Sequence, residues 1–107
     1  MIRGMVFGNT EQALIVEEVI KKLNAMNIDT TSVILSKEYS METFKEIQSQ
    51  MESKDFIVIL LNEKCKYTRI PTRTIPVELT GFNRAAITEN KVIYYITPED
   101  VPNWEFN

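Results

Sequence analysis

Phe56-Ile57-Val58-Ile59-Leu60-Leu61 is the longest uninterrupted apolar run of the sequence, and it decides the fold. The run shows no alternation of apolar and polar residues, which is typical of a strand covered on both faces inside a parallel sheet. Parallel strands need crossover connections, and these are usually helices. We therefore predict an α/β domain in which residues 56–61 form an interior strand.

The chain before this run indicates a strand followed by a helix. Residues 2–7 predict a first strand that ends at Gly8. Asn9 is placed to cap the helix that follows, and Gln12, three residues on, completes a capping box. This helix should end near Asn27, because apolar residues form one stripe at steps of three and four: Ala13, Val16, Val19, Ile20, Leu23 and Met26.

Further elements lie on both sides of the run. Residues 30–35, mostly β-branched, indicate a second strand, and Ser40 is placed to cap a second helix with apolar positions Met41, Phe44, Ile47 and Met51. After the run, Pro76 fits the first turn of a third helix, and residues 91–96 indicate a fourth strand. The tail from Thr97 should form a short turn and fold back on the edge of the sheet through Val101, Trp104 and Phe106.

The elements alternate as β-α-β-α-β-α-β. Because each crossover between parallel strands is right-handed, the three helices cannot all lie on one face unless the strand order never reverses. We therefore predict one three-layer α/β domain over residues 1–107. Its mostly parallel sheet should have four to five strands in the flavodoxin-like order 2-1-3-4.

Charge and cysteine content exclude several classes of function. With 12 Lys and Arg against 15 Asp and Glu, the net charge is -3, which argues against general nucleic-acid binding. The chain has no His and one Cys, so Cys/His zinc sites, His-based triads and intrachain disulfides are excluded, and we expect a cytoplasmic location. No apolar run approaches the ~20 residues that cross a bilayer, so we predict no membrane segment.

Ligands of open parallel sheets bind beyond the carboxyl ends of the strands, where the strand order reverses. Residues 7–10, 62–74 and 97–100 should meet there. The first of these stretches, Phe7-Gly8-Asn9-Thr10, offers backbone N–H groups to an anion at a helix start, and Gly8 would let a ligand approach the backbone closely. The alternative is a tight turn with a helix cap and no ligand.

The second stretch carries a local excess of positive charge. No Asp or Glu lies between Glu63 and Glu78, whereas four cations do: Lys64, Lys66, Arg69 and Arg73. The phosphates of a nucleotide would account for these cations, and Tyr67 is available to stack on a base or ribose. The alternative is a solvated loop. Cys65, with no His to activate it, is interpreted as an ordinary free thiol.

Glu78 is the candidate catalytic carboxylate. Its position at the start of the third predicted helix is explained structurally by the helix dipole, which stabilises a carboxylate there. The apolar neighbours Val77 and Leu79 would also desolvate part of the side chain, and desolvation gives carboxylates catalytic roles. Both interpretations stay open.

Two familiar sites are absent. The three glycines, Gly4, Gly8 and Gly81, cannot form a Gly-x-Gly-x-x-Gly loop or a P-loop. A phospho-acceptor receiver domain would need an Asp at the end of the central strand, where this chain has Asn62 and Glu63.

Several segments together carry a family resemblance. They are Met5-Val6-Phe7-Gly8 before the first helix, Ser40-Met41-Glu42-Thr43-Phe44 at the start of the second, Asp55 with the apolar run, Ile75-Pro76-Val77-Glu78-Leu79-Thr80-Gly81-Phe82, Lys91-Val92-Ile93-Tyr94-Tyr95-Ile96 and Pro98-Glu99-Asp100-Val101. Over nearly the full length, the pattern resembles the bacterial TIR-like nucleotide-binding domains, which share the flavodoxin-like topology and in several branches cleave NAD at the nicotinamide–ribose bond.

The resemblance implies roles for individual residues. Glu78 aligns with the family's catalytic glutamate, Phe7 and Gly8 with the loop beside the bound nucleotide, and Arg73 with a basic residue upstream of the glutamate. NAD or a related nucleotide would be the ligand, and the chain would be an NAD glycohydrolase-like hydrolase.

Two alternatives belong to other functional classes. Gly8-Asn9-Thr10-Glu11 is similar to the end of a flavodoxin phosphate loop, which implies FMN as the ligand, although the preceding hydroxyl residues are missing. The other alternative is a non-catalytic interaction module of the same fold that associates with further copies of itself, as TIR-like folds often do.

Overall fold

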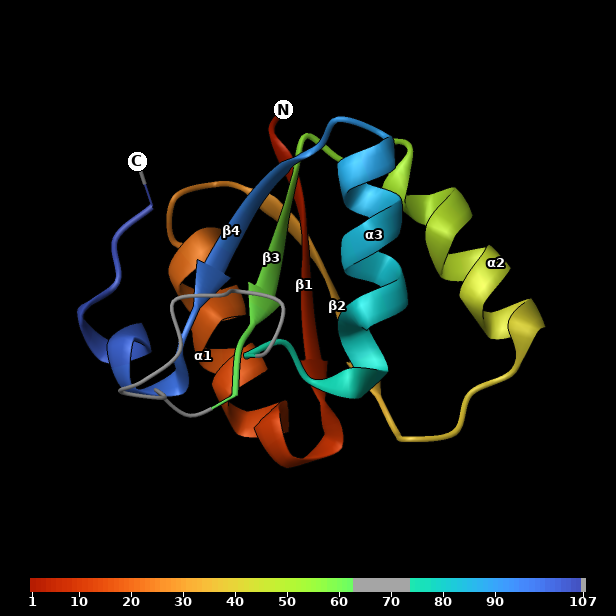
Figure 1. Ribbon diagram of the computed structural model, residues 1–107. Coiled ribbons are helices and arrows are strands. Elements are labelled where there is room, and N and C mark those ends of the chain that lie inside the picture. Colours follow the sequence, from red (N-terminus) through yellow and green to blue (C-terminus); the bar gives the residue numbers. More distant parts are fainter. Residues whose placement is uncertain (63–73, 107) are drawn as a thin grey trace.

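The computed structural model describes residues 1–62 and 74–106, which fold around one four-stranded parallel sheet (Figure 1). The strand order is β2-β1-β3-β4, which confirms the predicted 2-1-3-4 topology. The strands are β1 (Arg3–Asn9), β2 (Asp29–Leu35), β3 (Phe56–Leu60) and β4 (Val92–Ile96). Each adjacent pair of strands is parallel.

Helices cover both faces of the sheet. Helix α1 (Ala13–Asn24) lies on one face, and α2 (Met41–Met51) and α3 (Thr80–Thr88) lie on the other (Figure 1). The described residues also form three short 3-10 turns: η1 (Thr10–Gln12), η3 (Val77–Leu79) and η4 (Pro98–Asn103). No helix in the described ranges is both long enough and apolar enough to cross a membrane.

Helix boundaries follow local hydrogen bonds. The predicted capping box is present: the Gln12 N–H donates to the Asn9 side chain, and the Asn9 N–H donates to the Gln12 side chain. Helix α1 ends at Asn24, three residues before the predicted end, because Asn27 takes a left-handed φ of 62° and turns the chain toward β2.

The apolar run forms the interior strand β3, as predicted. All five residues of β3 are buried, and successive side chains point to opposite faces. Ile57 and Ile59 join the core beneath α2 and α3, which is centred on Phe82. Phe56, Val58 and Leu60 join the second core, beneath α1. This burial on both faces explains the lack of alternation in the sequence.

The C-terminal segment packs on a face of the sheet rather than on its edge. Val101 is fully buried, and the Phe106 ring lies 4.8 Å from that of Phe56 and 5.3 Å from that of Tyr94. The predicted fold-back is present, but its position differs, because α1 packs mainly over β1 and β2. Aromatic residues of the tail therefore cover β3 and β4 on the α1 face.

Candidate functional site

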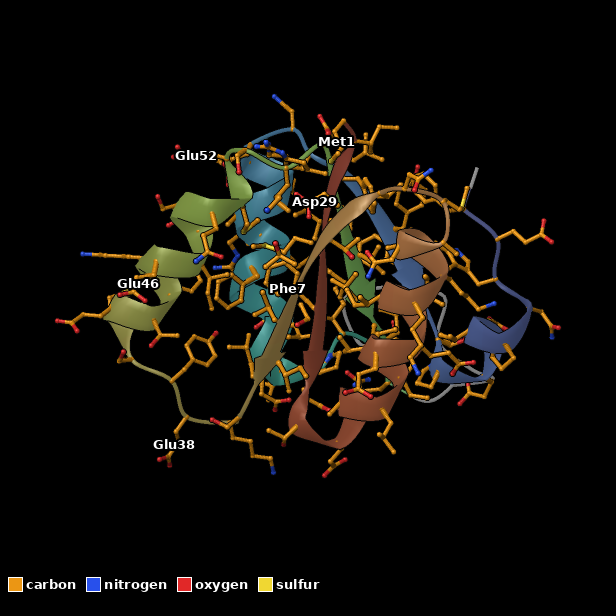
Figure 2. All side chains as sticks on the ribbon, turned by 180° about the vertical axis from the view of Figure 1, so that it is seen from behind. Met1, Phe7, Asp29, Glu38, Glu46 and Glu52 are labelled. Atoms are coloured by element: carbon orange, nitrogen blue, oxygen red, sulfur yellow. The ribbon has the colours of Figure 1, made fainter. Side chains whose placement is uncertain are left out.

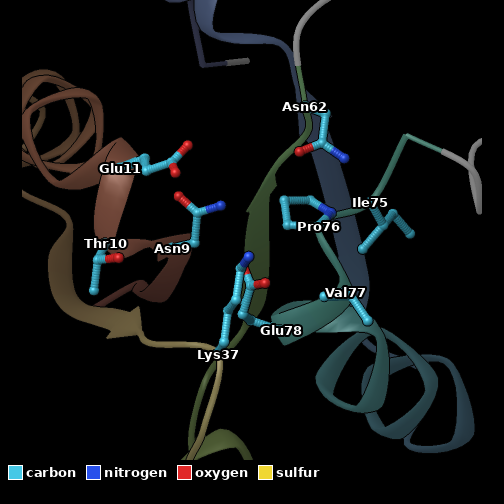
Figure 3. A pocket seen from close by; sticks show the side chains of 9 residues that line it. All are labelled: Asn9, Thr10, Glu11, Lys37, Asn62, Ile75, Pro76, Val77 and Glu78. Carbon is cyan, nitrogen blue, oxygen red and sulfur yellow. The ribbon is translucent and has the colours of Figure 1, made fainter.

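A two-part groove lies at the carboxyl edge of the sheet, over the ends of β1 and β3. Each part has a volume of about 450 Å³, and the parts share Asn9, Glu11 and Asn62. The first part is completed by Thr10, Lys37, Ile75, Pro76, Val77 and Glu78 (Figure 3), and the second by Gln12, Ile15, Pro98 and Glu99. This edge groove sits where the strand order reverses, as the topology predicts.

Gln12 fixes the floor of the edge groove. Its side-chain amide donates to the Leu61 carbonyl at 2.8 Å and accepts from the Asn9 N–H at 3.0 Å. The turn after β1 is thereby tied to the end of β3. Since Asn9 Oδ1 is engaged by the Gln12 N–H, the Asn9 amide nitrogen points into the groove (Figure 3).

The loop that was predicted to bind phosphates begins and ends at this groove. The Asn62 N–H donates to the Thr74 carbonyl at 2.7 Å, so residues on either side of the loop meet at the wall of the groove. Four predicted ligand-binding residues lie outside the described residues: Lys64, Tyr67, Arg69 and Arg73.

Glu78 lies in the 3-10 turn η3, which leads into α3, and faces the first part of the groove (Figure 3). Only 7% of the residue is exposed. Within residues 1–62 and 74–106, its carboxylate has no hydrogen-bond or ion-pair partner. Because the carboxylate oxygens have no partner there and are not fully buried, they are open to the groove and available to a ligand.

Tyr39 holds the backbone at Glu78. Its hydroxyl donates to the Glu78 carbonyl at 2.9 Å, and its ring lies 5.7 Å from that of Phe82. Burial, and then the negative charge of Glu78, raise the pKa of the Tyr39 phenol, so the hydroxyl stays protonated as a donor at neutral pH. The loop after β2 therefore supports the candidate carboxylate.

The described lining of the groove is acidic. It carries Glu11, Glu78 and Glu99 against one cation, Lys37. No group of three or more His, Cys, Asp or Glu side chains in the described part of the chain could hold a metal ion. Because the described lining contains no other Lys or Arg, Lys37 is the cation there that could bind a phosphate.

Two residues predicted to contact a nucleotide have structural roles in this fold. The Phe7 side chain is 0% exposed, with its ring 5.1 Å from that of Phe82. At Gly8, a Cβ would lie 2.5 Å from Val16 Cγ2, so this glycine lets α1 pack closely on β1. Asn9 and Thr10, by contrast, line the groove, and their contact with a ligand stays a prediction.

A Gly8→Ala variant should lower the free energy of unfolding by about 1–3 kcal/mol, because the added methyl group would overpack the contact between β1 and α1. Urea denaturation measures the loss. Gly81→Ala is the matched control, since its Cβ would meet only a ring edge of the half-buried Phe44, at 3.0 Å. Equal stabilities of wild type and Gly8→Ala would contradict the packing role.

Sequence reasoning did not identify Lys37 as a site residue. It named Glu11 only within the segment similar to a flavodoxin loop, and Ile75 and Val77 only as part of the segment around Glu78. Lys37 follows β2, whose carboxyl end lies beside that of β1, so the predicted strand order contained the signal that places Lys37 near the groove. Comparisons of the chain with protein-family models, with curated proteins and with solved structures find no match.

Proposed function

We propose that the edge groove binds a nucleotide of the NAD class and that Glu78 is the catalytic carboxylate for cleavage of its nicotinamide–ribose bond. The observation that carries the proposal is the Glu78 side chain, nearly buried, without a partner among the described residues, and facing an open hollow of about 450 Å³. The resemblance of the sequence to TIR-like domains supports the same role.

The reaction needs little from the protein beyond a fixed negative charge. As the bond between ribose C1′ and the nicotinamide nitrogen breaks, its electron pair leaves with the nicotinamide and positive charge develops on the ribose. A carboxylate held beside the ribose stabilises that charge. Water then adds to C1′ and releases a proton, giving ADP-ribose. Neither a metal ion nor a histidine is required.

Other residues of the groove suit the remaining parts of such a ligand. The side-chain amides of Asn9 and Asn62 can exchange hydrogen bonds with ribose hydroxyls. Ile75, Pro76 and Val77 form an apolar wall against which a planar ring can pack. Lys37 offers one positive charge to the pyrophosphate. The single cysteine of the chain suits a reducing cytoplasm, where this nucleotide is available.

Two measurements on the wild-type protein test the proposal. A thermal-shift series with NAD, ADP-ribose, cyclic nucleotides and FMN tests binding, since a ligand at 100 times its Kd adds about 2.7 kcal/mol of stability. We expect NAD and ADP-ribose to raise the melting temperature. Chromatography of NAD incubated with concentrated protein should then show nicotinamide and ADP-ribose.

The other outcomes assign the groove differently. A shift with FMN alone, together with a yellow purified protein, would replace the proposal with a flavodoxin-like one. If the protein is folded and none of these ligands changes its melting temperature, the non-catalytic interaction module becomes the favoured function. Binding of NAD without any cleavage would retain the ligand and overturn the role of Glu78.

A further inference from the structure

A second groove lies away from the carboxyl edge, between helix α1 and the edge strand β2. Its volume is about 350 Å³, and its lining is Val16, Glu17, Ile20, Lys21, Ser32 and Ile34. Its floor is apolar, and helix α1 contributes two charged side chains to it, the negative Glu17 and the positive Lys21. Ile34 is 41% exposed, although it belongs to a strand of the central sheet. We call this the α1–β2 groove.

Within residues 1–62 and 74–106, the outer edge of β2 has no partner strand. β2 is the last strand of the sheet on this side, and Figure 2 shows it in front of the ribbon, with α1 to one side of it and α2 to the other. Exposed edges are commonly guarded by Lys or Pro residues, which discourage pairing with another chain. The β2 sequence has neither, and its only charged residue is Asp29, at its first position. One lysine from outside the strand contacts it: Lys54 Nζ donates to Thr31 Oγ1 at 3.0 Å.

The two charges beside this edge suit a second copy of the same surface. Glu17 and Lys21 are four residues apart on α1, and neither has a hydrogen-bond or ion-pair partner among the described residues. A twofold axis perpendicular to the sheet and just outside the free edge of β2 would pair β2 antiparallel with its copy. The same axis sets the two α1 helices antiparallel on one face, so that Glu17 of each copy faces Lys21 of the other.

We infer that the α1–β2 groove and the free edge of β2 form the interface of a symmetric homodimer with a continuous eight-stranded sheet. Main-chain hydrogen bonds between the two β2 strands supply affinity, as they do whenever a strand is added to a sheet edge. Burial of Ile20 and Ile34 adds an apolar contribution. The two ion pairs between Glu17 and Lys21 fix the register.

Charge reversal at this surface tests the dimer. Sedimentation equilibrium of the wild-type chain should show a monomer–dimer equilibrium. Glu17→Lys or Lys21→Glu alone should weaken dimerisation roughly tenfold or more, because like charges would then face each other twice. The double variant Glu17→Lys with Lys21→Glu restores opposite charges and should recover the wild-type dissociation constant.

Glu42→Lys is the matched control for Glu17→Lys. It makes the same charge change at an exposed position of α2, away from the groove, and should leave the dissociation constant unchanged. Circular dichroism of each variant establishes that it is folded, so that a loss of dimer is not a loss of structure. A wild-type chain that stays monomeric at every concentration would overturn the proposal. It would also be overturned if the single variants dimerised as well as wild type, or if the double variant failed to recover.

Discussion

Ile57→Asp should leave the chain largely unfolded at room temperature. Ile57 is fully buried in the middle of the interior strand β3, between Met5 of β1 and Ile93 of β4. The variant loses about 1.5–3 kcal/mol of apolar burial and places a carboxylate among apolar side chains, which costs several kcal/mol more. Domains of this size are stable by only about 5–15 kcal/mol. Circular dichroism with urea denaturation measures the outcome.

Val92→Asp is the matched control for this variant. Val92 also lies in a strand of the sheet, but it is 55% exposed at the start of the edge strand β4, where a carboxylate keeps its water. Its cost should be within about 1 kcal/mol. An Ile57→Asp protein that unfolds cooperatively with near wild-type stability would contradict the burial of β3 on both faces.

The fold was accessible from the sequence because its strongest signals are local. The apolar run at residues 56–61 defines a doubly covered strand, and the capping box of Asn9 and Gln12 defines a helix start. Right-handed crossovers then leave few strand orders. The C-terminal segment was misplaced because its position depends on which part of the sheet α1 leaves uncovered. That is a tertiary property which no short window of sequence contains.

The candidate site was only partly accessible from sequence. Glu78 was identified because its carboxylate sits between apolar neighbours at a helix start, and Asn9 because it follows the first predicted strand and caps the next helix. Phe7 was taken as a ligand contact because it adjoins the turn after β1, but the alternation of side chains along β1 sends its ring into the core. Lys37 carries no local signal, since lysines are common in surface loops. Lys37 lies at the groove because it follows β2, whose carboxyl end is beside that of β1.

Glu78→Gln should reduce NAD cleavage by about two to three orders of magnitude, the loss seen when one preorganised electrostatic group is removed from an active site. The amide has nearly the same shape as the carboxylate but carries no charge to stabilise the developing positive charge on the ribose. The Tyr39 hydroxyl bonds to the Glu78 backbone carbonyl, so the position of the backbone should not change. Quantitative chromatography of nicotinamide release measures the loss.

Binding and stability separate a catalytic role of Glu78 from a structural one. Because no hydrogen bond or ion pair of this carboxylate is present among the described residues, the melting temperature of Glu78→Gln should stay close to that of wild type. The thermal shift with ADP-ribose should persist, since Lys37 and the amides of Asn9 and Asn62 are unchanged. Glu42→Gln, on the exposed side of α2, should retain full activity. Glu78→Gln with full activity would remove the catalytic role, whereas a large fall in its melting temperature would make Glu78 a residue that the fold itself requires.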